Sequence, residues 1–122
     1  MLKDDFFTVK EETGSDNERN YRLLLHASHP IFQAHFAGNP VMPGACITQM
    51  IKELTVAASG TAYFISSVKN MKFLHIINPL ENPEISVKLT NTVLENGCIS
   101  VSAFINAGDM VFSKAIVILK PI

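Results

Sequence analysis

Alternation of apolar and polar residues predicts two β-strands near the start of the chain. The apolar residues within 6–9 indicate a first strand, and the Gly-Ser-Asp-Asn run over 14–17 is typical of a turn. In the next segment, Arg22 and His26 separate apolar positions. A period of two places these apolar side chains on one face of a strand, so that face is expected to be buried. Its apolar positions are Tyr21, Leu23, Leu25 and Ala27.

The middle of the chain shows the one convincing helical pattern, over 45–59. Its apolar residues recur every three or four positions and form a broad stripe, which indicates a largely buried helix. Gly60 follows, at the position where a glycine commonly ends a helix. The opposite face carries Gln49, Glu53 and Val56, spaced about one turn apart. The apolar stripe consists of Ile47, Met50, Ile51, Leu54, Ala57 and Ala58.

The second half of the chain has the pattern of an antiparallel meander. Asn96-Gly97 is a strong hairpin signal, and Gly108-Asp109 is expected to turn the chain again. One long buried helix with a curved antiparallel sheet around it is an α+β architecture. A lone helix leaves the sheet edges exposed, so pairing with a second copy is expected. The predicted strands cover 63–68, 71–77, 85–90, 99–105 and 111–119.

The composition is that of a folded globular protein. The chain has 122 residues, of which 48% are hydrophobic and 17% charged, and this excludes a disordered, coiled-coil or collagen-like chain. We expect a single domain over 1–122, since this length buries a core without disulfides or a structural metal. The longest apolar run near the end, 115–119, is too short for a membrane helix. The net charge of −1, with no obvious basic face, disfavours nucleic acid as a partner.

The first residues and the cysteines favour a reducing compartment. The chain begins Met-Leu-Lys-Asp-Asp, with acids where an export signal carries cations, so we expect a cytoplasmic protein. Cys46 and Cys98 lack metal-site spacing, as do the histidines, and no metal is expected. Both thiols are expected to be reduced and buried. A catalytic Cys46 is the alternative, because a helix N-terminus stabilises a thiolate.

The segment 29–44 carries the candidate chemistry. Its three prolines and two glycines restrict it to few backbone shapes. It ends where the helix begins, and the first-turn N–H groups of a helix are unpaired and favour negative charge. The amide of Gly44 or Ala45 could therefore hold an oxyanion that develops on a carbonyl oxygen. His35 could act as a base beside it, because the pKa of histidine lies near neutral pH.

The string over 35–44 reads His-Phe-Ala-Gly-Asn-Pro-Val-Met-Pro-Gly and leads into the apolar helix. It closely resembles the 3-hydroxyacyl-[acyl carrier protein] dehydratases of fatty acid synthesis. The resemblance is specific over 30–60 and continues more weakly to the end, where 72–75 and 78–81 look like that family's strand and Pro-Gly-Asp turn, with Leu80 in place of the glycine. It implies the hot-dog fold, in which a curved antiparallel sheet wraps one long central helix.

The resemblance also implies roles for the matching residues. In that family, the histidine at the position of His35 removes the C2 proton of a 3-hydroxyacyl thioester, and the backbone carbonyl at Val41 holds the other ring nitrogen. The amide at Gly44 binds the thioester oxygen, and an acid on the helix handles the departing hydroxyl. Two copies pair so that the histidine of one faces the acid of the other, with the acyl chain in a tunnel between them. Phe36 and Met42 are candidates for the tunnel lining, although such residues are ordinarily core.

The sequence departs from the family at position 49, fourteen residues after His35, where the acid is replaced by glutamine. An amide cannot protonate a hydroxyl, and the loss of one general acid typically costs about 10²–10⁴ in rate. Glu53 lies one turn further on the same face, and many dehydratases of the family carry the reverse order, with the acid first. We expect Glu53 to supply the carboxyl directly or through a water held by Gln49, with its pKa raised by burial. Two alternatives stay open: Glu53, about 5.4 Å along the axis, only orients Gln49, or it is a solvated residue without a partner.

Three hypotheses about function follow. The first is a dehydratase-like protein that acts without a cofactor on 3-hydroxyacyl thioesters of acyl carrier protein or coenzyme A, in fatty acid or related acyl or polyene synthesis. The second is an acyl-carrier binding module that has lost the acid, and the third is a hot-dog thioesterase that uses a carboxylate such as Glu53 to activate water. The complete histidine loop favours the first two. The expected assembly is a homodimer or a trimer of dimers, and Lys52 could contact an acidic carrier protein, although a solvated lysine is the simpler interpretation.

Overall fold

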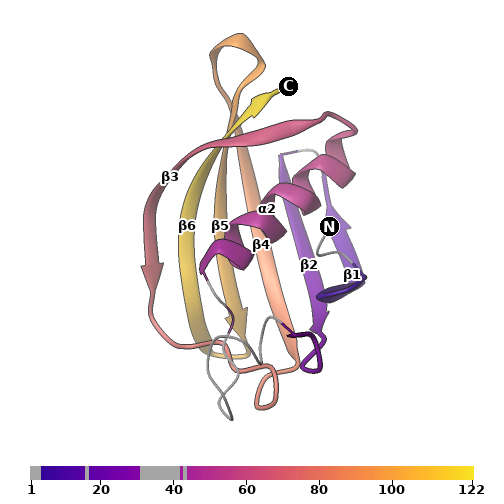
Figure 1. Ribbon diagram of the computed structural model, residues 1–122. Coiled ribbons are helices and arrows are strands. Elements are labelled where there is room, and N and C mark those ends of the chain that lie inside the picture. The colour runs from indigo at the N-terminus through magenta and orange to yellow at the C-terminus, as the bar shows by residue number, and fades with distance from the viewer. Residues whose placement is uncertain (1–3, 16, 31–41, 43) are drawn as a thin grey trace.

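The computed structural model describes residues 4–15, 17–30, 42 and 44–122. Figure 1 shows a long helix, α2, lying across the concave face of a curved sheet. Within the described residues, no helix is both long enough and apolar enough to cross a membrane. Helix α2 covers Gly44–Ser59, and the strands are β1 (Phe7–Gly14), β2 (Glu18–Leu25), β3 (Tyr63–Phe73), β4 (Glu84–Val93), β5 (Ile99–Ala107) and β6 (Met110–Pro121).

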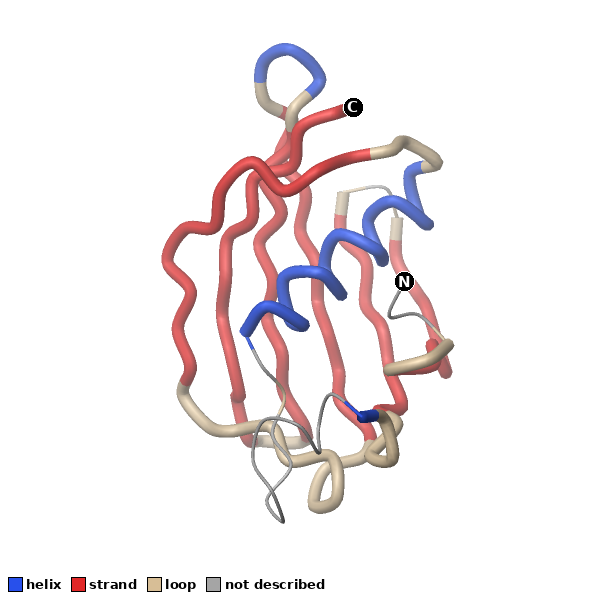
Figure 2. Tube along the Cα trace, viewed as in Figure 1, coloured by secondary structure: helices blue, strands red, loops and turns tan. Residues whose placement is uncertain are grey.

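The six strands form one antiparallel sheet in the order β1-β2-β4-β5-β6-β3. Strands β1 and β3 are therefore its edges, and Figure 2 shows the helix crossing the sheet between them. This arrangement confirms the predicted α+β class, with one central helix wrapped by a curved sheet.

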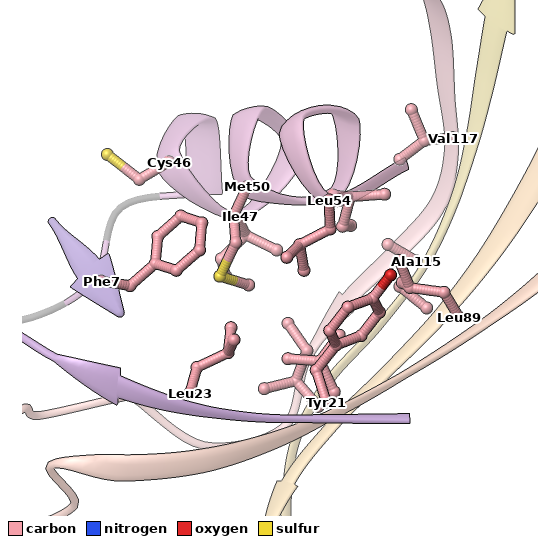
Figure 3. Packing of buried hydrophobic residues seen from close by; sticks show 14 of the residues in the cluster. Phe7, Tyr21, Leu23, Cys46, Ile47, Met50, Leu54, Leu89, Ala115 and Val117 are labelled. Atoms are coloured by element: carbon pink, nitrogen blue, oxygen red, sulfur yellow. The ribbon is translucent and has the colours of Figure 1, made fainter. Parts of the chain in front are cut away.

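The core lies between α2 and the inner face of the sheet, as the two periodicities predict. The buried side chains of β2, β4, β5 and β6 alternate with exposed ones, and the stripe of α2 packs on them (Figure 3). Ala57 and Ala58 were expected in this stripe, but Ala57 is exposed and Ala58 half-buried. They lie at the C-terminal end of the helix, past the deepest part of the core. The buried helix residues include Cys46, Ile47, Met50, Ile51 and Leu54.

Glycine and asparagine end the elements where the sequence predicts. Gly60 has a φ of +72° and its N–H donates to the Val56 carbonyl over 2.9 Å, so it ends α2. Asn96 and Gly97 both have positive φ, 60° and 78°, as a tight hairpin between β4 and β5 requires. Gly108, with a φ of 57°, makes the turn into β6.

Two strand predictions were wrong. The strands predicted over 63–68 and 71–77 are one strand, β3, and it ends at Phe73. A bulge between Lys69 and Lys72, with Asn70 at a φ of 53°, absorbs the irregularity, because β6 continues as its partner on both sides. Strand β2 ends at Leu25 rather than at Ala27, since the next N–H donates outside the ladder, to the Phe6 carbonyl.

Candidate functional site

Three of the predicted site residues lie outside the described residues. These are the candidate base His35, the carbonyl of Val41 and the side chain of Phe36. Their roles therefore stay predictions. The structure describes the other half of the site, which consists of the helix N-terminus and the polar face of α2.

The helix N-terminus is held by contacts from β3 and from the segment that follows it. The Met42 N–H donates to the carbonyl of Ile77 over 2.9 Å, and the Met42 side chain belongs to the hydrophobic core. The Phe73 ring lies against Gly44 so closely that a Cβ added there would be 2.9 Å from its Cζ atom. Gly44 and Ala45 are the first residues of α2, where an N–H has no acceptor within the helix. The backbone here can thus present amide donors beside an aromatic ring.

Gln49 and Glu53 form a hydrogen-bonded pair on the face of α2 that points away from the core. Nε2 of Gln49 donates to Oε2 of Glu53 over 3.0 Å. The Glu53 residue is only 7% exposed, although its side chain is ionisable. The interpretation of Glu53 as a solvated residue without a partner is therefore wrong. A carboxylate accepts hydrogen bonds only, so this contact turns the NH₂ of Gln49 toward Glu53.

A pocket of about 370 Å³ opens beside this pair. Its polar side is formed by Gln49, Lys52 and Glu53, and the rest of its lining is mostly apolar. An apolar pocket with a few convergent polar groups is the usual form of a small-molecule site. The remaining lining residues are Val56, Ala57, Ala62, Tyr63 and Ile122.

Sequence reasoning missed part of this site. Tyr63 is the first residue of β3 and Ala62 directly precedes it, and both line the pocket together with residues of α2. Phe73 was expected in the middle of a strand, whereas it ends β3 against Gly44. The alternation within β3 marks Tyr63 as buried, but no signal in the sequence shows that it faces the same pocket as Glu53.

Cys46 is the third residue of α2 and is buried. Burial raises the pKa of its thiol above the ordinary value of 9.0. This direction is opposite to the stabilised thiolate that a catalytic cysteine needs, so it disfavours the alternative of a reactive Cys46. Among the described residues, no three His, Cys, Asp or Glu side chains cluster as they would around a metal ion.

The sequence is similar to known dehydratases over most of its length. The family described as ApeI-like, ApeI dehydratase, matches residues 10–113. A 3-hydroxyacyl-[acyl-carrier-protein] dehydratase FabZ from Caulobacter sp. (strain K31) is 31% identical over 97 residues, which cover 72% of this chain and 58% of that protein. The FabZ of Latilactobacillus sakei is 35% identical over 75 residues, covering 56% of this chain and 54% of that protein. The chain thus spans just over half the length of these two relatives.

Solved structures share the fold. The dehydratase heterocomplex ApeI:P from Xenorhabdus doucetiae matches with a TM-score of 0.69 and 16% identity, over 93% of this chain and 96% of that chain. A hypothetical thioesterase protein with coenzyme A from Streptococcus pneumoniae matches with a TM-score of 0.67 and 10% identity, over 97% and 88% of the two chains. At these identities the structures establish the hot-dog fold alone, whereas the sequence match over 10–113 establishes the family. The chain belongs to the ApeI-like dehydratase family.

Proposed function

We propose that this protein eliminates water from 3-hydroxyacyl thioesters, giving trans-2-enoyl thioesters. The observation that carries the proposal is the buried carboxyl of Glu53, bonded to Gln49 at the polar side of an apolar pocket. A carboxyl in such surroundings suits proton transfer, and the apolar wall suits an acyl chain.

The proposed reaction needs a base, an oxyanion site and an acid. His35 takes the C2 proton while the amide of Gly44 or Ala45 holds the thioester oxygen, on which enolate character builds. Val41 accepts a hydrogen bond from the other ring nitrogen of His35 and so sets its tautomer. The electron pair of the C2–H bond forms the C2–C3 double bond, and the C3 hydroxyl leaves as water.

Glu53 is the proposed source of the proton that the departing hydroxyl takes. Gln49 lies between Glu53 and the helix N-terminus, so its amide can hold the hydroxyl or a bridging water. Phe36 and Met42 are proposed to contact the acyl chain, although the structure places Met42 in the core.

The spacing along α2 supports a dimer. At 1.5 Å per residue, Glu53 lies about 14 Å along the axis from Gly44. The Gly44 amide is proposed to act at C1 of the substrate and the Glu53 carboxyl at C3, and these two atoms are only two bonds apart. The two groups of the same chain are therefore too far apart to act on one substrate. We therefore propose that the amide of one copy works with the acid of a second copy. Strand β3 is a free edge for such pairing, and it exposes Phe64 and Val68 to 42% and 43%.

A second candidate function is the binding of acyl thioesters without turnover. The observation that favours it is the amide at position 49, where the resemblance to the dehydratases implies an acid. In that case Glu53 would only orient Gln49 through their hydrogen bond.

One assay separates these functions. The protein is given a 2-enoyl thioester and, separately, a 3-hydroxyacyl thioester, and enoyl absorbance and free thiol are followed together. Hydration and dehydration that disappear in His35→Ala, with an unchanged thermal unfolding curve, support the dehydratase. Binding without either change supports the second candidate, and release of free thiol indicates a thioesterase. Sedimentation velocity, alone and with candidate partner chains, tests the homodimer against a heterocomplex of the kind the Xenorhabdus protein forms.

A further inference from the structure

The hairpin between β4 and β5 projects beyond the end of the sheet and carries exposed apolar side chains (Figure 1). Val93 is 77% exposed and Leu94 is 40% exposed. Both line a hollow of about 650 Å³, together with Cys98, Ile118 and the single charged residue Glu95. Exposed apolar side chains that gather in one place mark a site of interaction, because single ones are scattered on an ordinary surface.

The hairpin is held in a fixed position against the end of the sheet. The Leu94 N–H donates to the Cys98 carbonyl over 2.8 Å, and the Cys98 N–H donates to the Glu95 carbonyl over 3.1 Å. A Cβ added at Gly97 would lie 3.3 Å from Cγ of Pro121, so the turn packs on β6. The apolar tip is therefore a defined part of the molecular surface.

The outer face of β6, which points away from α2, extends this apolar surface along the sheet. Ile116 and Ile118 alternate with Val117 and Leu119, which are buried. Because successive side chains of a strand point to opposite faces, both isoleucines lie on the outer face, where each is half-buried. Ile118 also lines the hollow beside the hairpin, so the hairpin and β6 form one apolar surface.

Two lysines flank this surface. By the same alternation Lys120 lies on the outer face, two residues after Ile118. Lys69 of β3 lies directly opposite Ile116. Neither lysine forms an ion pair with a carboxylate of the described residues. We call Lys69, Val93, Leu94, Ile116, Ile118 and Lys120 the tip surface.

Basic residues nearer to β1 on the same outer face are neutralised, in contrast to those of the tip surface. Arg22 is paired with Glu11 at 3.2 Å, and Lys88 is paired with Glu18 at 3.0 Å. The whole chain carries a net charge of −1, so any attraction of the tip surface to an anion depends on its own lysines.

We propose that the tip surface docks on a membrane that contains anionic phospholipid. A bilayer surface presents phosphate groups above acyl chains, and the tip surface presents lysines beside apolar side chains. Val93 and Leu94 would enter the boundary between headgroups and acyl chains, while Lys69 and Lys120 would face the phosphates. A protein partner fits less well, because a projecting turn on the convex side of a sheet offers it little complementary shape.

The position of the tip surface places the membrane beside the apolar end of the pocket that contains Glu53. The N–H of Ile122, two residues after Lys120, donates to the Ala62 carbonyl over 3.1 Å, and both residues line that pocket. The start of α2 lies at the other end of the sheet from the hairpin and would stay clear of the membrane (Figure 1). The inference itself uses only charge, exposure and register, and so does not rest on the proposed function.

The charged half of the proposal is tested by flotation with vesicles. The wild type is mixed with vesicles of phosphatidylglycerol and phosphatidylcholine in equal parts, or of phosphatidylcholine alone, and should float with the first only. Lys69→Gln/Lys120→Gln should bind the anionic vesicles about tenfold more weakly. The matched control, Arg22→Gln/Lys88→Gln, removes two positive charges that are already paired and should stay within about twofold. Salt should release the wild type, because it screens the lysines.

The apolar half is tested by fluorescence. The chain contains no tryptophan, so Leu94→Trp places a unique reporter at the tip. Its emission should shift to the blue on addition of anionic vesicles, because indole favours the membrane–water interface. Ile76→Trp is the control: Ile76 is 71% exposed in the segment between β3 and β4, at the other end of the sheet, and its reporter should not shift.

Several results would overturn the proposal. They are no flotation of the wild type with anionic vesicles, equal flotation with both kinds of vesicle, equal weakening in the two double variants, or an unshifted emission of Leu94→Trp. Tighter binding of polyglutamate than of anionic vesicles, with the same dependence on Lys69 and Lys120, would assign the surface to an acidic protein instead. Unchanged thermal unfolding curves show that the variants are folded, and no thioester enters these measurements, so a failure of the proposed function leaves their result intact.

Discussion

Replacing Glu53 by glutamine tests whether Glu53 acts as an acid or only positions Gln49. The substitution keeps the size of the side chain and leaves a carbonyl oxygen that can still accept from Nε2 of Gln49, now 3.0 Å from the Glu53 carboxyl. It removes the proton that a carboxyl can transfer and the charge of the carboxylate, neither of which an amide supplies. The two roles therefore predict different losses of rate.

The losses of rate that the two roles of Glu53 predict differ widely. Loss of a general acid costs about 10²–10⁴ in rate, or about 3–5 kcal/mol at 1.36 kcal/mol per decade. If Glu53 only orients Gln49, a charge-assisted hydrogen bond of about 1.5–3 kcal/mol is exchanged for a neutral one of about 0.5–1.5 kcal/mol. The difference of about 1 kcal/mol corresponds to roughly a fivefold loss. We expect the Glu53→Gln variant to lose at least about 100-fold in kcat/KM.

The assay is hydration of a 2-enoyl thioester by the purified protein, with thermal unfolding as the folding control. The matched variant is Gln49→Glu/Glu53→Gln, which places the acid first and the amide one turn later, the order that the resemblance to the dehydratases implies. If Glu53 supplies the acid that the family resemblance places at position 49, the swapped variant should recover most of the activity that Glu53→Gln loses. A loss below tenfold in Glu53→Gln would refute the acid role, and unchanged turnover would remove Glu53 from the mechanism.

The remaining predictions concern Tyr21, Cys46 and Gly44. Tyr21→Phe removes a buried hydroxyl that has no partner among the described residues, so urea unfolding at pH 7 should show unchanged or slightly higher stability. Burial, and after it the charge of Glu12, raises the pKa of Tyr21 to about 12 from 10.0, so the unfolded chain ionises first. As pH rises from 10 to 12, the wild type should therefore lose about 2 kcal/mol of stability relative to Tyr21→Phe, and a constant difference would contradict this. Because burial also raises the pKa of the Cys46 thiol, iodoacetamide at pH 7 should modify it far more slowly in the folded than in the urea-unfolded protein, and rapid labelling of the native thiol would argue against the packing described. Gly44→Ala should displace the exposed Phe73 ring and lower kcat/KM by about tenfold or more, while the unfolding free energy changes by less than about 1 kcal/mol. Adding Phe73→Ala should restore the activity, and a double variant as slow as Gly44→Ala would show that this contact does not cause the loss.

Local chemistry explains what the sequence could predict. The helix over 45–59 follows from its apolar spacing, and the structure shifts its start by one residue, to Gly44. The Asn96-Gly97 hairpin follows from the positive φ that these residues tolerate. The i,i+4 spacing placed Gln49 and Glu53 on one face, and the structure adds the direction of their hydrogen bond.

The features that the sequence could not predict depend on pairing between strands that are distant in the sequence. Asn70 within a run of polar residues is typical of a break between strands, but β6 continues as a partner past it and makes one bulged strand. Lys72 lies opposite Lys114 because β3 pairs with β6, and the sequence around either residue does not show which distant strand is its partner. For the same reason, the chain alone gave no sign that Phe73 would meet Gly44.

The bulge in β3 also limits how copies of this chain can grow into larger assemblies. An unpaired, flat outer strand is a template on which chain after chain can add, ending in fibres. Asn70 interrupts this strand with a left-handed kink, and charged Lys69 and Lys72 flank it. A second irregularity, between Ile65 and Ser67, shortens the regular stretches of this edge further. A chain from which Asn70 is deleted should aggregate on concentration, visible as thioflavin-positive material that the parent protein does not form.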